Sequence, residues 1–221
     1  MASHGEDRPL GMMIPPVPAG TEIPPEPPDV AARTLLVASR MMCGATTFFF
    51  LAFVFAYFYL RSLNQDHMWR TGHMKPNAGL GVAFVVCIAL SVVLTQVAER
   101  SKKEQAPGWV GPAVGAIVLG LAAVVFQCLE FTSQNFGPTD GAYASVFCAW
   151  LGFYMIAVLA TIYWLETHVA TELRARRQPA SSDGDLKEPD RLIAPGLDAA
   201  TFYWSFLGAI GVLTYVVLYL L

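Results

Sequence analysis

Five long apolar runs constrain this chain more than any other feature of its sequence. The runs occupy residues 41–60, 80–97, 109–131, 143–164 and 202–221. Each approaches the ~20 residues that an α-helix needs to cross a hydrocarbon core about 30 Å thick. Because a backbone in lipid must satisfy its own hydrogen bonds, we expect one transmembrane helix per run. The predicted fold class is an all-α integral membrane protein, a bundle of five transmembrane helices.

The composition agrees with a lipid environment. Hydrophobic residues make up 55% of the chain and charged residues only 14%, and the mean hydropathy is +0.47. Soluble domains carry about 25% charged residues, so most soluble classes are excluded. The net charge is -3, and we expect no nucleic-acid partner.

The first 33 residues differ from the rest of the chain. They are acidic and contain eight prolines between residues 9 and 28, which favours an extended, polyproline-like tail. They lack the apolar region of a signal peptide, so the first span is expected to act as its own insertion signal. The predicted organisation is a cytoplasmic tail over residues 1–33 and a membrane domain over residues 34–221.

The distribution of cations predicts the orientation. A cytoplasmic N-terminus places 11 Lys and Arg residues in the inner segments and only 3 in the outer ones. The inner set is Arg8, Arg33, Arg40, Arg100, Lys102, Lys103, Arg174, Arg176, Arg177, Lys187 and Arg191, and the outer set is Arg61, Arg70 and Lys75. The positive-inside rule therefore predicts a cytoplasmic N-terminus and an outer C-terminus.

The segments between the spans suggest how the helices are connected. The polar stretch over residues 166–198 is typical of a solvated cytoplasmic linker, which begins as an extension of the fourth helix or directly after it. The other connections are short, so consecutive helices are expected to be neighbours. Gly111 and Gly115 form a GxxxG motif that favours close helix packing. Four tryptophans near span ends are expected to anchor the protein at the membrane surfaces: Trp69, Trp109, Trp164 and Trp204.

An amide and a carboxylate lie one turn apart inside the third span. Gln127 and Glu130, at i and i+3, share one helix face. An ionisable group in a bilayer costs roughly 2.5 to 3.5 kcal/mol unless it finds a partner. We therefore expect this face to contact protein, with Gln127 and Tyr143, across the short loop, as the partners of Glu130.

The residues that bind metals and haem in other proteins are poorly placed here. The four cysteines, Cys43, Cys87, Cys128 and Cys148, all lie in spans without a CxxC pair, and are interpreted as buried apolar thiols. The four histidines, His4, His67, His73 and His168, lie in tails, loops or span ends, which excludes a haem site deep in the bundle. A metal site at His67, His73 and Asp66 is the alternative, but groups scattered over one loop are more typical of a wet surface. We predict no catalytic, cofactor-binding or metal-binding residue in this chain.

Three blocks of residues occur in a fixed order. AYFYLR, residues 56–61, ends the first span. Gln127 and Glu130 precede a short loop with Asp140 and Gly141, and then Tyr143, Ser145, Phe147, Gly152 and Phe153. The last block contains Asp198, Ala199, Ala200, Tyr203, Trp204 and Phe206, followed by Tyr215 and Tyr219. Together the blocks resemble subunit III of the haem-copper oxidases, in its short five-helix bacterial form, over residues 35–221.

The chain departs from that family at several polar positions. Thr46 stands where the family usually has a carboxylate, and Tyr154 and Ala157 stand where it usually has histidines. Ser205 and Gly208 replace a common His and Asp in the last helix. The chain resembles a divergent member, and roles that depend on those positions do not transfer to it.

The resemblance implies an accessory subunit of a terminal respiratory oxidase, which reduces dioxygen to water and pumps protons. Haem and copper would belong to the partner subunits I and II, and electrons would arrive from cytochrome c or a quinol-oxidising complex. This subunit would pack on subunit I in the bacterial plasma membrane, bind phospholipid, and support proton uptake and active-site stability. The polar positions it points to are Gln127, Glu130, Asp140, Tyr143, Tyr203 and Trp204, and the lipid-binding candidates are Arg40, Arg61 and Trp109.

Two alternatives stay open. A subunit III-like protein that accompanies a nitric oxide reductase would share the fold and the motif. A small transporter or channel would use Gln127 and Glu130 to line a substrate path. The chain has no clear internal repeat, which argues against a transporter built from inverted halves.

Overall fold

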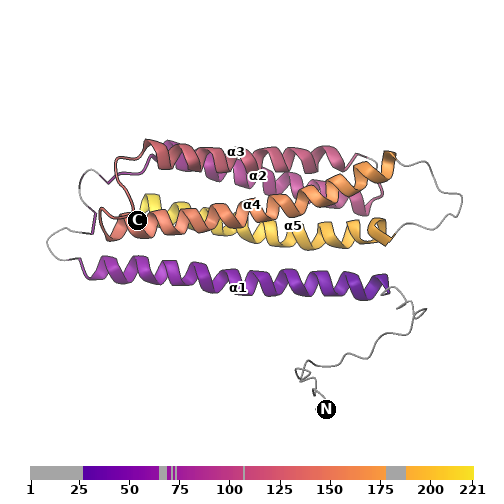
Figure 1. The fold of residues 1–221 in the computed structure, drawn as a ribbon, viewed down its shortest axis with the longest axis horizontal. Helices are drawn as coiled ribbons and strands as arrows, with labels where there is room; N and C mark the ends of the chain where they lie inside the picture. Colours follow the sequence, from indigo (N-terminus) through magenta and orange to yellow (C-terminus); the bar gives the residue numbers. More distant parts are fainter. Residues whose placement is uncertain (1–26, 65–68, 71, 73, 107, 178–187) are drawn as a thin grey trace, which may run out of the picture.

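Five long helices make up the described part of the chain, and each is long and apolar enough to cross a membrane (Figure 1). The computed structural model describes residues 27–64, 69–70, 72, 74–106, 108–177 and 188–221. The helices are α1 (Pro28–Ser62), α2 (Ala78–Lys103), α3 (Val110–Ser133), α4 (Ala142–Arg177) and α5 (Glu188–Tyr215), and α5 continues into a short π-helix, η1 (Val216–Leu220). The prediction of an all-helical membrane bundle with five spans is confirmed.

The helices extend well beyond the apolar runs. α1 begins at Pro28, a position where proline is tolerated because the first helical N–H groups have no helical partner. Its 35 residues reach about 52 Å, longer than a hydrocarbon core. Residues 28–33, assigned to the tail above, are therefore helical, whereas residues 1–26 lie outside the described part.

The expectation of a linker over residues 166–198 needs correction. α4 continues to Arg177, since strong helix formers follow the apolar run and Glu172 bonds Arg176 one turn later at 2.9 Å. α5 already begins at Glu188 and contains Pro195. Among residues 166–198, only 178–187 lie outside the described helices.

Helix order in the bundle differs from helix order in the chain. α2 packs on α3 and α5, α4 packs on α3 and α5, and α1 packs on α5 and α4. In Figure 1, α1 lies on the side of the bundle away from α2 and α3. The expectation that consecutive helices are neighbours is therefore wrong for α1 and α2. Their connection is long enough to cross the end of the bundle, and its Trp69 ring lies 5.8 Å from that of Tyr143 at the start of α4.

The two ends of the bundle differ in charge. We call the end that carries the α2–α3 and α4–α5 connections the basic end, because Arg100, Lys102, Lys103, Arg174, Arg176 and Arg177 lie there. The α1–α2 and α3–α4 connections and the C-terminus lie at the opposite end (Figure 1). α4 is the most buried helix and α1 the least.

Candidate functional site

Glu130 lies on the buried face of α3 and contacts the start of α2. Both Gln127 and Glu130 are buried, at 1% and 0% exposure, as their i, i+3 spacing predicts. Glu130 Oε1 accepts a hydrogen bond of 2.7 Å from the backbone N–H of Asn77. The Asn77 side chain in turn accepts bonds from the N–H groups of Gly79 and Leu80, at 3.0 and 3.4 Å. The carboxylate thus holds the residue that caps α2.

The expected partners of Glu130 are not its hydrogen-bond partners. Neither polar atom of the Gln127 side chain makes a hydrogen bond, and Oε2 of Glu130 is also unpaired. The Tyr143 hydroxyl donates instead to the carbonyl of Leu218 in η1, at 2.7 Å. The sequence correctly suggested that Glu130 needs a protein partner. The actual partner, the backbone N–H of Asn77, could not be predicted, because every residue except proline has a backbone N–H and Asn77 is distant in sequence.

A tyrosine at the C-terminus completes this group. The Tyr219 phenol lies beside Gln127 and Glu130, although its hydroxyl lacks the geometry of a hydrogen bond to either. Its ring covers Gly81 of α2, where any larger residue would collide with it. We call Gln127, Glu130, Tyr143 and Tyr219 the polar cluster. It joins α2, α3, α4 and η1 at the end opposite the basic end.

Arg70 lies over the polar cluster from the α1–α2 connection. Its guanidinium carbon is 4.7 Å from the centre of the Tyr143 ring, a cation–π contact, and its Nε donates to the carbonyl of Met74 at 2.9 Å. Arg70 therefore fixes the chain where it crosses the start of α4.

Asp140 lies outside the polar cluster. It is exposed in the α3–α4 loop, where Oδ2 accepts a bond of 2.6 Å from the N–H of Gly137. Ser145 donates to the carbonyl of Pro138 across the same turn, at 2.6 Å. These contacts give Asp140 a role in shaping the loop.

Tyr203 and Trp204 contact other helices from α5. The Tyr203 hydroxyl shares a hydrogen bond of 2.9 Å with Thr46 on α1. Trp204 Nε1 donates to Ser91 Oγ on α2 at 3.0 Å, and Ser91 donates to the carbonyl of Ala116 on α3 at 2.7 Å. Ser91 was not among the predicted residues, because one serine in an apolar helix carries no signal of its partners.

The positions that depart from the oxidase pattern contribute to helix packing. Thr46 bonds Tyr203, and the Tyr154 hydroxyl donates to the carbonyl of Leu207 at 2.8 Å. Ala157 lies on α4, where its carbonyl accepts a bond from Thr161 at 2.8 Å. Gly208 packs so closely on Val92 that a larger residue would collide with it. Ser205 accepts a bond of 3.3 Å from Gln96.

The tryptophan and cysteine positions correct two expectations, and the glycine positions agree with a third in part. Trp69, Trp109 and Trp204 are buried in protein, so they are not surface anchors, and Trp164 is only partly exposed. In the GxxxG motif, a Cβ at Gly115 would lie 3.0 Å from Leu94 of α2, as close helix packing predicts, whereas Gly111 faces open space. Gly120, which continues the small-residue spacing, contacts Ile162 and Trp204. Cys128 is exposed and Cys43, Cys87 and Cys148 are half-buried, and all four are free thiols.

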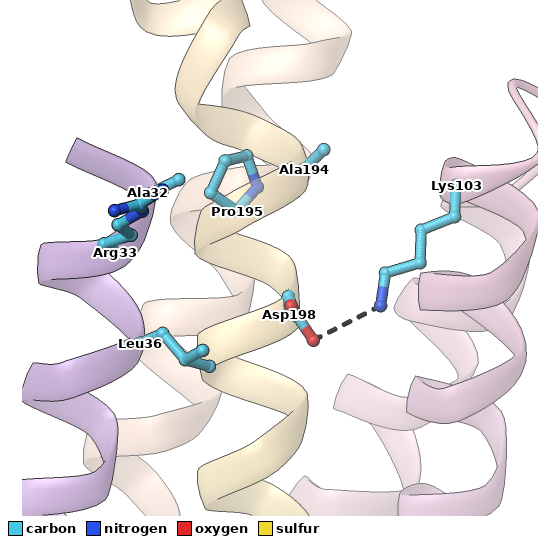
Figure 2. A pocket seen from close by; sticks show the side chains of 7 residues that line it. All are labelled: Ala32, Arg33, Leu36, Lys103, Ala194, Pro195 and Asp198. Atoms are coloured by element: carbon cyan, nitrogen blue, oxygen red, sulfur yellow. Dashed lines mark hydrogen bonds and ion pairs between the residues drawn. The ribbon is translucent and has the colours of Figure 1, made fainter. Parts of the chain in front are cut away.

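Two pockets lie at the basic end. A pocket of about 320 Å³ separates the start of α1 from α5, lined by Ala32, Arg33, Leu36, Lys103, Ala194, Pro195 and Asp198 (Figure 2). Lys103 reaches across from α2 to Asp198, at 3.4 Å. A second pocket of about 500 Å³ lies between the α2–α3 connection and α4. Trp109 lines this second pocket.

The other lipid-binding candidates lie elsewhere. Arg40 is exposed on α1, and Arg61 lies at the far end of the same helix, over the Tyr57 ring at 5.9 Å. The three candidates therefore do not form one site.

The described residues include no group of three His, Cys, Asp or Glu side chains that could hold a metal ion. His168 lies in α4 against Gly196 of α5, while His4, His67 and His73 lie outside the described part. No family model matches the chain, and no curated protein matches it in sequence.

Proposed function

We propose that this chain is an accessory subunit of a terminal respiratory haem-copper oxidase, in the position of subunit III. It lies in the bacterial plasma membrane with a cytoplasmic N-terminus and an outer C-terminus. Partner subunits I and II hold the haem and copper, reduce dioxygen and pump protons. This chain packs on subunit I, binds lipid and stabilises the catalytic subunit.

One observation carries the proposal: three polar residues of the oxidase-like blocks, Glu130, Tyr143 and Trp204, are bonded to other helices within the bundle. Glu130 contacts α2, Tyr143 contacts η1, and Trp204 contacts α2. Such contacts favour a structural role over a catalytic one. They also weigh against a transporter, in which these side chains would line an open path.

The departures limit the proposal in one respect. Thr46, where the family usually has a carboxylate, is neutral and bonded to Tyr203. Proton transfer through this position of α1 is therefore not part of the proposed role. The chain supports proton uptake indirectly, by keeping the catalytic subunit assembled.

Affinity purification from native membranes tests the proposal. The tagged full chain, solubilised in mild detergent, is expected to bring down a haem protein and a copper-binding subunit, with oxygen consumption in the eluate. An unrelated tagged membrane protein from the same cells is the control. Recovery of a haem complex that reduces nitric oxide and lacks the copper subunit would support the reductase alternative. Recovery of the intact chain without haem would overturn the proposal.

A further inference from the structure

We propose that the polar cluster binds a water molecule that joins Glu130, Gln127 and Tyr219 inside the bundle. Four polar atoms of these side chains are buried without a hydrogen-bond partner in the described part of the chain: Gln127 Nε2, Gln127 Oε1, Glu130 Oε2 and the Tyr219 hydroxyl. Buried polar atoms in proteins are nearly always bonded, either to protein or to ordered water. Four exceptions in neighbouring side chains therefore indicate a ligand. The inference needs no partner subunit and does not depend on the proposed function.

The three side chains face one place. Gln127 and Glu130 lie one turn apart on the buried face of α3, at 1% and 0% exposure. The Tyr219 phenol of η1 lies beside both, yet its hydroxyl is in hydrogen-bond geometry with neither. Neighbouring polar groups that do not bond directly are a typical setting for a bridging water.

Other contacts prevent these groups from simply turning toward one another. Glu130 Oε1 accepts from the N–H of Asn77 at 2.7 Å, so rotation of the carboxylate would break that bond. The Tyr219 ring fills the space over Gly81 and packs on the Phe147 ring, at 5.7 Å between the ring centres. A small ligand that bonds in several directions satisfies such fixed groups without moving them.

The chemistry of the four atoms fits water. Glu130 Oε2 and Gln127 Oε1 accept hydrogen bonds, Gln127 Nε2 donates them, and the Tyr219 hydroxyl does either. One water can donate to the carboxylate and to a second acceptor while it accepts from the amide or the phenol, which gives about three bonds, as buried waters typically make. A calcium ion fits less well, because it takes roughly six to eight oxygen ligands and the site offers three.

The position of the site gives water a short way in. Glu130 lies three residues before the end of α3 at Ser133, which corresponds to about 4.5 Å along the helix axis. This is the end opposite the basic end, where the α3–α4 connection begins (Figure 1). Water from that side reaches the site without crossing the apolar middle of the bundle.

Radiolytic footprinting of the purified full chain in detergent tests the inference. A brief X-ray pulse forms hydroxyl radicals from water, including bound water, and mass spectrometry measures the oxidation rate of each side chain. We expect Tyr219 to be oxidised about fivefold faster than Tyr154, a fully buried tyrosine whose hydroxyl donates directly to the carbonyl of Leu207. Gln127→Leu removes both amide atoms that bond the water, and should lower the Tyr219 rate about threefold.

Gln96→Leu is the matched control, because it is the same substitution at an amide that already has a partner. Gln96 Nε2 donates to Ser205 Oγ at 3.3 Å. It lies fifteen residues beyond Gly81 on α2, about 22 Å from the site along the helix axis. Its loss should change the Tyr219 rate by less than about 1.5-fold, since distant sites act independently.

Two footprinting results would overturn the inference. Equal rates for Tyr219 and Tyr154 would mean that no water lies beside Tyr219. An unchanged Tyr219 rate in Gln127→Leu would mean that the radicals come from bulk solvent.

A second measurement decides the question if Gln127→Leu does not fold. Cryo-electron microscopy of the unaltered chain, at a resolution that shows ordered water, should place one water oxygen about 2.5 to 3.2 Å from Glu130 Oε2 and from an atom of Gln127 or Tyr219. A direct hydrogen bond from Glu130 Oε2 to either residue, with no water between them, would contradict the inference. A cation surrounded by oxygen ligands at the same place would contradict it as well.

Discussion

At the scale of single residues, the carboxylate of Glu130 accepts a bond from the N–H of Asn77, and Asn77 caps the first turn of α2. The side chain is buried, and its other oxygen is unpaired. The bundle therefore needs a hydrogen-bond acceptor for the N–H of Asn77 at the place of Glu130 Oε1, and either a carboxylate or an amide oxygen can provide it.

We expect Glu130→Gln to leave stability almost unchanged, because the amide oxygen can accept the same bond. Glu130→Leu leaves the N–H of Asn77 unpaired in a buried place and should lower the free energy of unfolding by about 1 to 3 kcal/mol. In the proposed oxidase complex, Glu130→Gln should keep turnover and Glu130→Leu should weaken binding to subunit I. Thermal unfolding in detergent and turnover of the purified complex measure the two effects. Loss of proton pumping in a fully assembled Glu130→Gln complex would contradict this structural role.

Ser91 is the second residue whose side chain joins several helices. It lies on α2, donates to the carbonyl of Ala116 on α3 and accepts from the indole of Trp204 on α5. The Ser91 hydroxyl thus links α2, α3 and α5 through two buried hydrogen bonds.

Removing that hydroxyl with Ser91→Ala is expected to cost about 1 to 2 kcal/mol, since the Trp204 indole N–H loses its buried acceptor. Thr95→Val, one turn further along, is the matched control. The Thr95 hydroxyl donates only to the carbonyl of Ser91 in its own helix, so its loss should cost less than about 0.5 kcal/mol. Equal losses for the two variants, measured by thermal unfolding, would show that the three-helix junction adds no stability.

At the scale of helices, glycines and tyrosines determine how closely α5 approaches its neighbours. A Cβ at Gly211 would lie 2.6 Å from the Tyr154 hydroxyl of α4. The same hydroxyl donates to the carbonyl of Leu207, one turn earlier on α5. The lack of a side chain at Gly211 therefore leaves the space that the Tyr154 hydroxyl needs to reach the Leu207 carbonyl.

This pairing predicts a coupled effect. Gly211→Ala alone should destabilise the protein by about 1 to 3 kcal/mol, because the packed hydroxyl has no free space. In a Tyr154→Phe background the nearest ring atom is 3.3 Å from the new Cβ, so the same substitution should cost clearly less. A double-mutant cycle of unfolding free energies measures the coupling. Additive effects would contradict a direct contact between the two positions.

The sequence predicted the helices better than their arrangement. Apolar length is a property of each segment alone, so all five spans could be found. The helix ends were harder to predict, because residues 166–177 continue α4 through helix propensity after the apolar run has ended. Neighbour order could not be deduced, since the exposed surfaces of all five helices are apolar and the hydrogen bond that joins α1 to α5, between Thr46 and Tyr203, depends on the fold. Within the site, the spacing of Gln127 and Glu130 predicted burial, whereas the Asn77 partner depended on the fold.

At the scale of the whole molecule, charge separates the two ends. The described cations concentrate at the basic end, whereas Arg61, Arg70 and Lys75 lie at the other. The helices alternate in direction, so the basic end includes the start of α1 and the C-terminus lies opposite (Figure 1). The positive-inside rule then predicts that the basic end is cytoplasmic.

Reporter fusions test this orientation. Alkaline phosphatase is active only outside the cytoplasm, and green fluorescent protein exported in unfolded form fluoresces only inside. We expect phosphatase activity after Leu221 and none at Ser182 between α4 and α5, with the opposite pattern for fluorescence. The two reporters at both sites control for each other, because a fusion that fails to insert would lose both signals. Neutralising Arg174, Arg176 and Arg177 together should shift part of the population toward the inverted pattern, as loop cations set topology. Phosphatase activity at Ser182 in the unaltered chain, with fluorescence after Leu221, would contradict a cytoplasmic basic end.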